Sequence, residues 1–374
     1  MNKHVGTIMG VALLATRAWA AEDPLEKVSW AKNIKFKGDL RYRFEYIDEE
    51  GKEARQRDRI RARLAAEAVV NPNVTAGIGV SSGSEDPVSS NQSLTDGFSR
   101  KNVALELAYF DWQMIEQLAL TGGKFKNPFT AVSDLVWDGD LNPEGLALTG
   151  KTGNDQVELT GGAGYLWVVE RSGENDDTMC YVGQAAAKVN VTPEVYIKVG
   201  GGYYGYDNLE GYDVIDYEKK NNAYGNTTAN RVVGSVTNKI YATEYQLVEA
   251  FAEIGVWVGI PLTAFGHYVV NTEADSQDTG YQAGVSAGKA KNPRTYEVGY
   301  SYAELEKDAV VGAFTDSDRW GGGTDGRGHK FLARYQMSKN WQIGGTYFLN
   351  ERAIADAAKK HDYDRVQLDL VAKF

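Results

Sequence analysis

The sequence predicts an all-β protein: a transmembrane, antiparallel, up-and-down β-barrel of about 16 strands, with short periplasmic turns and long extracellular loops. Three observations predict this fold. Short segments alternate between apolar and polar side chains, the connections between them are alternately short and long, and the composition favours glycine and tyrosine. The 374 residues include 41 Gly and 22 Tyr but only 8 Pro. A membrane barrel turns only every second strand residue toward lipid, so it needs no continuous apolar run.

The N-terminus has the features of a secretory signal peptide. Lys3 lies in a short basic start, residues 5–16 are largely apolar, and Ala18-Trp19-Ala20 has the small-residue pattern of a cleavage site. The apolar stretch is too short to cross a membrane as a helix. We therefore expect export to the bacterial outer membrane. The expected parts are a signal peptide over 1–20, cleaved after Ala20, a short periplasmic segment over 21–33 and the barrel over 34–374.

The first predicted strand, over residues 34–47, shows the alternation clearly. Tyr42 and Phe44 fall on one face, and Arg41 and Arg43 fall on the other. Successive side chains of a strand point to opposite faces, so one face is apolar and the other polar. The further predicted strands cover residues 55–70, 74–82, 102–113, 118–125, 145–150, 156–170, 179–191, 194–206, 243–258, 262–271, 280–290, 295–305, 329–337, 341–350 and 363–374.

The connections between these segments support the same fold. Every second connection is a short turn, such as Asn71-Pro72-Asn73, and the alternate ones are mostly longer. Outer-membrane barrels have short turns at one end and long loops at the other. About sixteen strands also falls in the range that encloses an aqueous channel. The chain ends on an aromatic residue, Phe374, which is predicted to be the signal read by the barrel-assembly machinery.

The second predicted strand carries five arginines spaced two residues apart. At about 3.3 Å per residue they would form a ladder roughly 26 Å long on one face. Facing lipid, each charge near the bilayer midplane would cost about 2–4 kcal/mol, so we expect the ladder to face the lumen. Basic residues of the first strand fall on the same face. The predicted cationic wall consists of Lys35, Lys37, Arg41, Arg43, Arg55, Arg57, Arg59, Arg61 and Arg63.

Three motifs carry a family resemblance. Residues 122–129 (GGKFKNPF), 136–141 (VWDGDL) and 314–325 (FTDSDRWGGGTD) resemble segments of the "Putative porin" family of Gram-negative outer membranes. The likeness extends over nearly the whole mature chain, from residue 34 to 374. It implies a general-diffusion-porin-like barrel in a membrane of lipid and lipopolysaccharide. A homotrimer is an expectation from general porins. The resemblance names no solute.

Acidic groups should face the arginine ladder, because arginines about 6.6 Å apart repel by roughly 0.6 kcal/mol per pair even in water. In general diffusion porins the third outer loop folds into the lumen and narrows it. Here that connection contains Asp134, Asp138, Asp140 and Glu144. Opposite the arginines, these acids would set a transverse field that filters solutes by polarity as well as by size. The alternative is that they are solvated outside the membrane.

The sequence thus predicts a water-filled channel for passive diffusion of small hydrophilic solutes and ions, with a mild preference for anions. No cofactor and no metal site is expected. Asp316, Asp318 and Asp325 could offer calcium ligands, but they lack the full spacing of a calcium loop, so we expect a loop that hydrogen-bonds itself. A net charge of −11 disfavours nucleic acid as a partner.

Two other functions stay open at this point. One is a barrel that acts as a sheath for a cytochrome or another protein partner, because a cationic wall would also suit an anionic protein. The other is an outer-membrane enzyme. It is disfavoured because His267, His329 and His361 have no recognisable serine motif around them, although sequence alone leaves a triad possible.

Overall fold

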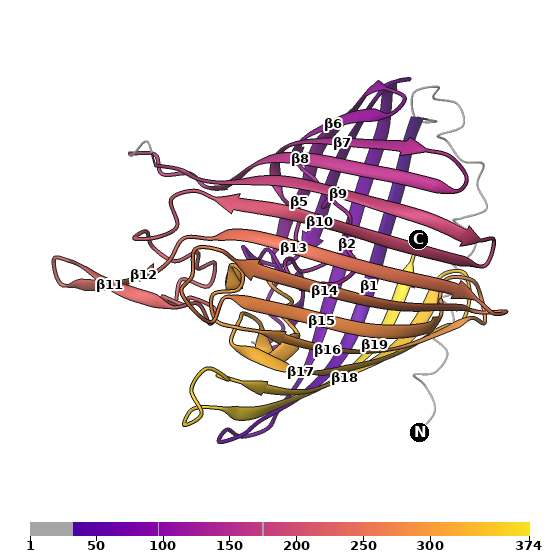
Figure 1. Ribbon diagram of the computed structural model, residues 1–374. Coiled ribbons are helices and arrows are strands. Elements are labelled where there is room, and N and C mark those ends of the chain that lie inside the picture. The colour runs from indigo at the N-terminus through magenta and orange to yellow at the C-terminus, as the bar shows by residue number, and fades with distance from the viewer. Residues whose placement is uncertain (1–32, 96, 174–175) are drawn as a thin grey trace, which may run out of the picture.

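The chain forms a closed β-barrel (Figure 1). The computed structural model describes residues 33–95, 97–173 and 176–374. The predicted signal peptide, and all of the predicted periplasmic segment except Asn33, lie outside these residues. One 17-stranded sheet contains β4 (Gln92–Ser93), a short strand in a loop, and sixteen long strands that follow one another around the barrel. The predicted fold class and strand number are therefore confirmed.

Strand positions also agree with the prediction, and the strand ends differ from it by at most about three residues. The barrel strands are β1 (Ile34–Glu49), β2 (Arg55–Asn71), β3 (Val74–Ser82), β5 (Val103–Ile115), β6 (Leu118–Lys124), β7 (Glu144–Gly153), β8 (Val157–Val169), β9 (Thr178–Thr192), β10 (Val195–Tyr206), β13 (Gln246–Trp257), β14 (Pro261–Asn271), β15 (Thr279–Gly288), β16 (Tyr296–Leu305), β17 (Gly326–Gln336), β18 (Trp341–Arg352) and β19 (His361–Lys373).

The two faces of the strands differ as the alternation predicts. On β1, Leu40 and Tyr42 are exposed on the outside of the barrel, whereas Arg43 and Glu45 are buried inside it. The last strand follows the same rule, with Leu368 exposed and Arg365 and Gln367 buried. The apolar outer surface is the face that a membrane barrel presents to lipid. Among the described residues, no helix is long and apolar enough to cross a membrane.

Long loops occupy one end of the barrel, and four of them matter for the site. We name them by their order along the chain: L2 (residues 83–102), L3 (125–143), L5 (207–245) and L7 (306–325). L5 contains a hairpin that the sequence did not predict, formed by β11 (Thr228–Val233) and β12 (Val236–Tyr241), which projects beyond the barrel (Figure 1). L7 contains two short 3-10 helices, η3 (Gly312–Phe314) and η4 (Arg319–Gly321).

The barrel closes where β1 pairs with β19, from Asp39 opposite Lys373 to Glu49 opposite Tyr363. Just beyond this pairing, Gly38 and Phe374 exchange two backbone hydrogen bonds of 2.9 and 3.1 Å. A Cβ atom at position 38 would lie only 2.5 Å from the ring of Phe374. The terminal aromatic ring therefore occupies the space that the missing side chain of Gly38 leaves.

Replacing Gly38 by Val should destabilise the closure of the barrel, because the new methyl groups would displace the Phe374 ring at a cost of about 1–3 kcal/mol. Gly183→Val is the matched control, since no heavy atom lies within 4 Å of a Cβ built at Gly183. The measurement is the temperature at which the folded band disappears in SDS gel electrophoresis. Equal temperatures for the two variants would show that this contact contributes nothing to closure.

Candidate functional site

The polar face of β1 and β2 lines two adjoining cavities in the lumen. The outer cavity measures about 750 Å³ and is lined by Arg55, Arg57 and Arg59. The inner cavity measures about 450 Å³, and Val88 and Ser317 border both cavities. Arg61 and Arg63 of β2 and Arg41 and Arg43 of β1 line the inner cavity. From here on, the ladder means the five arginines of β2 together with Arg41 and Arg43.

Strand register brings arginines of β1 and β2 directly opposite one another. Arg41 lies opposite Arg61, and Arg43 lies opposite Arg59. Like charges in such positions destabilise a sheet. Asp39, on the same lumen face, offsets part of this repulsion, because it accepts hydrogen bonds from Arg61 at 2.9 Å and Arg63 at 2.8 Å.

Two more acids of the barrel wall neutralise the ladder. Glu45 is fully buried and forms an ion pair with Arg57. Asp369 on β19 receives two hydrogen bonds from Arg43, at 2.7 and 2.8 Å, which is the strong bidentate arrangement of guanidinium and carboxylate. The wall thus supplies much of its own counter-charge.

L3 lies inside the barrel, because it contacts strands on several sides of the lumen. Asp140 accepts a hydrogen bond from Arg63 on β2 at 3.1 Å. The backbone of Thr130 donates to Gln184 on β9 at 2.7 Å. Asp134 accepts a hydrogen bond from Lys330 on β17 at 3.0 Å. A loop that touches these three strands crosses the interior.

The four acids predicted for this loop lie in different places. Asp140 is the one that the structure brings to the ladder, 3.1 Å from Arg63 and 3.6 Å from Arg61. Asp134 faces the other wall, and Asp138 accepts a hydrogen bond from the backbone of Ser317 in L7 at 3.2 Å. Glu144 stays at the start of β7, where it pairs with Lys124 at 2.7 Å.

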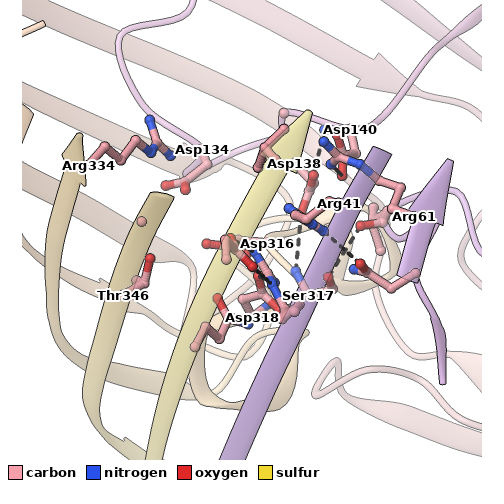
Figure 2. Close-up of a pocket in the computed structure, with 18 of the residues that line it drawn as sticks. Arg41, Arg61, Asp134, Asp138, Asp140, Asp316, Ser317, Asp318, Arg334 and Thr346 are labelled. Atoms are coloured by element: carbon pink, nitrogen blue, oxygen red, sulfur yellow. Dashed lines mark hydrogen bonds and ion pairs between the residues drawn. The ribbon is translucent and has the colours of Figure 1, made fainter. Parts of the chain in front are cut away.

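L7 also reaches into the lumen, which was not predicted from the sequence. Asp318 accepts hydrogen bonds from Arg43 at 3.0 Å and from Arg365 at 2.7 Å. Asp316 accepts one from Lys330 at 3.2 Å. Figure 2 shows Asp316 and Asp318 between the side bearing Arg41 and Arg61 and the side bearing Arg334. L7 does hydrogen-bond itself as expected, for example from the backbone of Asp318 to Asp316, but it also binds the wall.

An apolar cluster explains why these loops fold inward. Val136 and Trp137 of L3 and Val310 and Trp320 of L7 are all buried in one cluster, together with Tyr206 at the end of β10. The indole nitrogen of Trp137 donates a hydrogen bond to the hydroxyl of Tyr206 at 3.1 Å. Burying such side chains favours a packed interior over solvent-exposed loops. The two loops therefore fill part of the lumen.

The remaining predicted cations lie toward the ends of the ladder. Lys35 and Lys37 are exposed on β1, and Lys37 pairs with Glu67 at 2.9 Å. Arg55 is exposed and lines the outer cavity. These three side chains belong to the same face as the other arginines, and Arg55 shares the lining of the outer cavity with residues of L7.

Several buried carboxyls of the loops have strongly shifted pKa values. Burial alone would raise the pKa of Asp318, but Arg43 and Arg365 outweigh it and hold that pKa well below its usual range. The pKa of Asp138 is well above its usual range, because the carboxyl is buried and lies near Asp316 and Asp140. In L2, burial raises the pKa of Asp86 to about 6, against the opposing influence of Arg59.

A hydrogen-bonded chain fastens L3 to the far side of the lumen. The Oγ of Ser133 lies 2.8 Å from Nδ1 of His267, and Nε2 of His267 lies 2.9 Å from Glu249. In a Ser-His-Asp triad the serine meets Nε2 and the carboxylate meets Nδ1, so the ring here has the reverse orientation. The serine Oγ also accepts a hydrogen bond from the backbone of Leu135 at 3.3 Å.

Several residues of the site were not singled out from sequence. Arg365 and Asp369 occupy the polar face of the last strand, and its alternation was the available signal. Asp316 and Asp318 were singled out only as possible calcium ligands, although their spacing of two residues matches that of the ladder. Asn91 in L2 accepts a hydrogen bond from Arg41 at 2.6 Å, and no sequence pattern marks it.

Solved structures with the same fold come from several outer-membrane proteins. OprB of Pseudomonas putida, solved at high pH, matches with a TM-score of 0.59 and 12% identity, over 92% of this chain and 94% of OprB. OmpF of Salmonella typhi, in complex with daunomycin, matches with a TM-score of 0.53 and 10% identity, over 91% and 97% of the two chains. The trimer form of in-vitro folded OmpT of Vibrio cholerae matches with a TM-score of 0.51 and 12% identity, over 91% and 99%.

At these identities the structures show the fold alone. No curated protein matches the chain. A family model described as "Putative porin" matches residues 47–233 and 220–374, which together cover the barrel from the end of β1 to the C-terminus. The chain therefore belongs to this family of outer-membrane porins.

Proposed function

We propose that the protein is a passive diffusion channel for small hydrophilic solutes and ions, with a lumen that mildly prefers anions. The observation that carries this proposal is the arginine ladder that runs along both cavities. In each cavity the lining lysines and arginines outnumber the lining aspartates and glutamates by one. A small excess of positive charge in a narrow, partly desolvated passage attracts anions.

Two features keep the preference mild. The carboxylates of L3, L7 and the barrel wall pair directly with the arginines, so little charge is left to act at long range. A further cavity beside L2 and β5 is lined by more acids than bases. The acids that were expected to set a transverse field instead form short ion pairs with the arginines. Asp140 and Asp318 are the main carboxylates of these pairs.

The constriction in this proposal is built by two loops. L3 and L7 are joined to each other, since the backbone of Asp138 donates a hydrogen bond to the carbonyl of Phe314 at 2.8 Å. They leave cavities of about 450 and 750 Å³, which suit small solutes rather than a folded protein. A sheath for a cytochrome would require both loops to leave the lumen, so we favour the channel over this alternative.

We assign the Ser133–His267–Glu249 chain a structural role rather than a catalytic one. Glu249 also accepts hydrogen bonds from Gln184 at 2.8 Å and Tyr204 at 3.1 Å, which hold its carboxylate in a fixed position. The proposal also includes cleavage after Ala20, recognition of Phe374 by the barrel-assembly machinery, and a homotrimer in a membrane of lipid and lipopolysaccharide.

Changing Arg57, Arg59 and Arg61 together to Gln should shift the channel toward cations, because two lining charges are lost from the outer cavity and one from the inner cavity. The measurement is the zero-current potential in a planar bilayer across a potassium chloride gradient. Lys220, Lys239 and Lys359, changed together to Gln, remove the same charge from the outer loops and should cause a much smaller shift. A triple arginine variant that folds without any shift would contradict the proposal.

Lowering the pH should strengthen the anion preference. The Asp86 carboxyl, with its pKa of about 6, is ionised at about pH 7.5 and gains a proton by about pH 5, which removes a negative charge from the lining of the outer cavity. The same bilayer measurement at the two pH values tests this, and Asp86→Asn should lose part of the change. An unaltered pH response in that variant would show that Asp86 does not contribute.

Replacing His267 by Ala should loosen L3, because the loop loses its link to Glu249, worth about 1–3 kcal/mol. We expect larger and noisier single-channel currents. His329→Ala is the matched control, since Nδ1 of His329 forms a hydrogen bond of 2.9 Å with the hydroxyl of the exposed Tyr300 on the outer surface. Currents of His267→Ala that equal those of the control would mean that the chain does not hold the loop.

A further inference from the structure

The arginines of the ladder differ in how well they are neutralised. Arg43, Arg57, Arg61 and Arg63 each have a carboxylate oxygen within 3.0 Å. In the part of the chain that the structure describes, Arg41 has no carboxylate within 4.0 Å, and the carboxylate nearest to Arg59 is Glu45 at 3.9 Å. Glu45 is already engaged by Arg57. Arg55, which is exposed at the outer end of the ladder, also has no carboxylate within 4.0 Å among the described residues. Of the arginines that are at least partly buried, Arg41 and Arg59 are therefore the two whose charge is least neutralised.

These two guanidinium groups also carry hydrogen-bond donors that are not used. The Nε atoms of Arg41 and Arg59 are buried and have no hydrogen-bond partner. A buried donor without a partner is costly, and native proteins usually satisfy such a donor with protein, water or an ion. Arg41 and Arg59 therefore each retain one hydrogen-bond donor that the protein does not satisfy.

L2 brings the two arginines together at one place. Arg41 donates through Nη2 to the side-chain oxygen of Asn91 at 2.6 Å, and Arg59 donates through Nη2 to the backbone oxygen of Asn91 at 3.5 Å. Arg41 lies opposite Arg61, and Arg59 lies opposite Arg43, so Arg41 and Arg59 are diagonal neighbours across β1 and β2. Asn91 thus bridges the two under-neutralised charges.

This place lies at the junction of the two cavities. Arg59 lines the outer cavity, Arg41 and Asn91 line the inner cavity, and Val88 of L2 borders both. A solute that follows the ladder from one cavity to the other passes both arginines. The donors Nε and Nη of a guanidinium form a planar fork that matches the two oxygens of a carboxylate or phosphate.

We propose that Arg41, Arg59 and Asn91 form a binding site for the oxyanion group, carboxylate or phosphate, of a permeating solute. The proposal rests on the proposed channel function and adds to it a saturable site, so that the channel conducts small oxyanions by binding and release. Chloride has no pair of oxygens to engage the fork and should pass without saturation.

The test uses the full-length protein with Arg41 and Arg59 both changed to Lys. This double variant keeps the charge but removes both forks. Arg57 and Arg63 changed together to Lys provide the matched control, because those arginines are paired with carboxylates. The readout is single-channel conductance against concentration, measured separately in potassium succinate, potassium phosphate and potassium chloride.

For the wild type we expect conductance to saturate in succinate or phosphate and to stay proportional to concentration in chloride. The Arg41→Lys/Arg59→Lys variant should half-saturate at a concentration about tenfold higher, as expected for the loss of a charge-assisted hydrogen bond. The Arg57→Lys/Arg63→Lys control should saturate like the wild type. Saturation in succinate alone would assign carboxylates, and saturation in phosphate alone would assign phosphates.

Two results would overturn the site. One is a wild type whose conductance is proportional to the concentration of both oxyanions. The other is saturation that both double variants change equally. Because either result can occur in an open channel, it would leave the proposed function standing.

Calorimetric titration of the folded protein in detergent, with succinate and with phosphate, tests the binding site independently of the channel function. In a barrel that does not conduct, saturable heat in the wild type that weakens in the Arg41→Lys/Arg59→Lys variant would support the site while the proposed function fails. No saturable heat with either anion would overturn the site.

Discussion

Arginines at every second position of a membrane-spanning strand impose the constraint on which this structure depends. They cannot face lipid, because each would cost about 2–4 kcal/mol near the midplane. They therefore face the lumen, where the register of β1 and β2 sets Arg41 against Arg61 and Arg43 against Arg59. Such a cluster is tolerable only if carboxylates reach it. The arrangement of acids in the lumen follows from that need.

The carboxylates come from three sources. Asp39 and Glu45 belong to β1 itself, and Asp369 becomes available only because β19 closes the barrel against β1. Asp140 and Asp318 arrive on loops that fold inward. Each inward loop also buries apolar side chains, so the packing of Trp137 and Trp320 and the pairing of charge favour the same loop positions. The ladder and the loops thereby shape the passage together.

The carboxylates do not neutralise all the arginines of the ladder. We propose that the remaining positive charge gives the lumen its preference for anions. Arg41 and Arg59 have Asn91 as a neighbour instead of a close carboxylate. A fully paired wall would act as a neutral polar surface, whereas we propose that the two incompletely neutralised guanidinium groups at the junction of the cavities attract passing anions. L2 contributes both Val88 and Asn91 to the lining of the inner cavity.

The barrel could be predicted from sequence because its determinants are local. Alternation along residues 34–47, the turn at Asn71-Pro72-Asn73 and the spacing of the arginines each report on a single strand or turn. The partners of the arginines could be predicted only in part. Asp140 was expected to meet the ladder, but the place of Asp134 beside Lys330 depends on the path of L3 across the lumen.

The contacts of L7 show most clearly what could not be predicted from the sequence. Asp316 and Asp318 were visible as acids in a glycine-rich segment, yet their contacts with Lys330, Arg43 and Arg365 arise from packing between distant parts of the chain. The sequence pattern suggested a calcium loop or a self-contained loop. Within the described ranges no group of three or more His, Cys, Asp or Glu side chains is arranged so that it could hold a metal ion. The acids of L7 pair with cationic side chains.

The most direct test of the account is the single-channel conductance and zero-current potential of the refolded wild-type protein in a planar bilayer across a potassium chloride gradient. A diffusion channel with this arginine wall should give stable, ohmic open steps and a zero-current potential whose sign shows a mild preference for chloride. A folded barrel that never opens, or one that clearly prefers potassium, would contradict it.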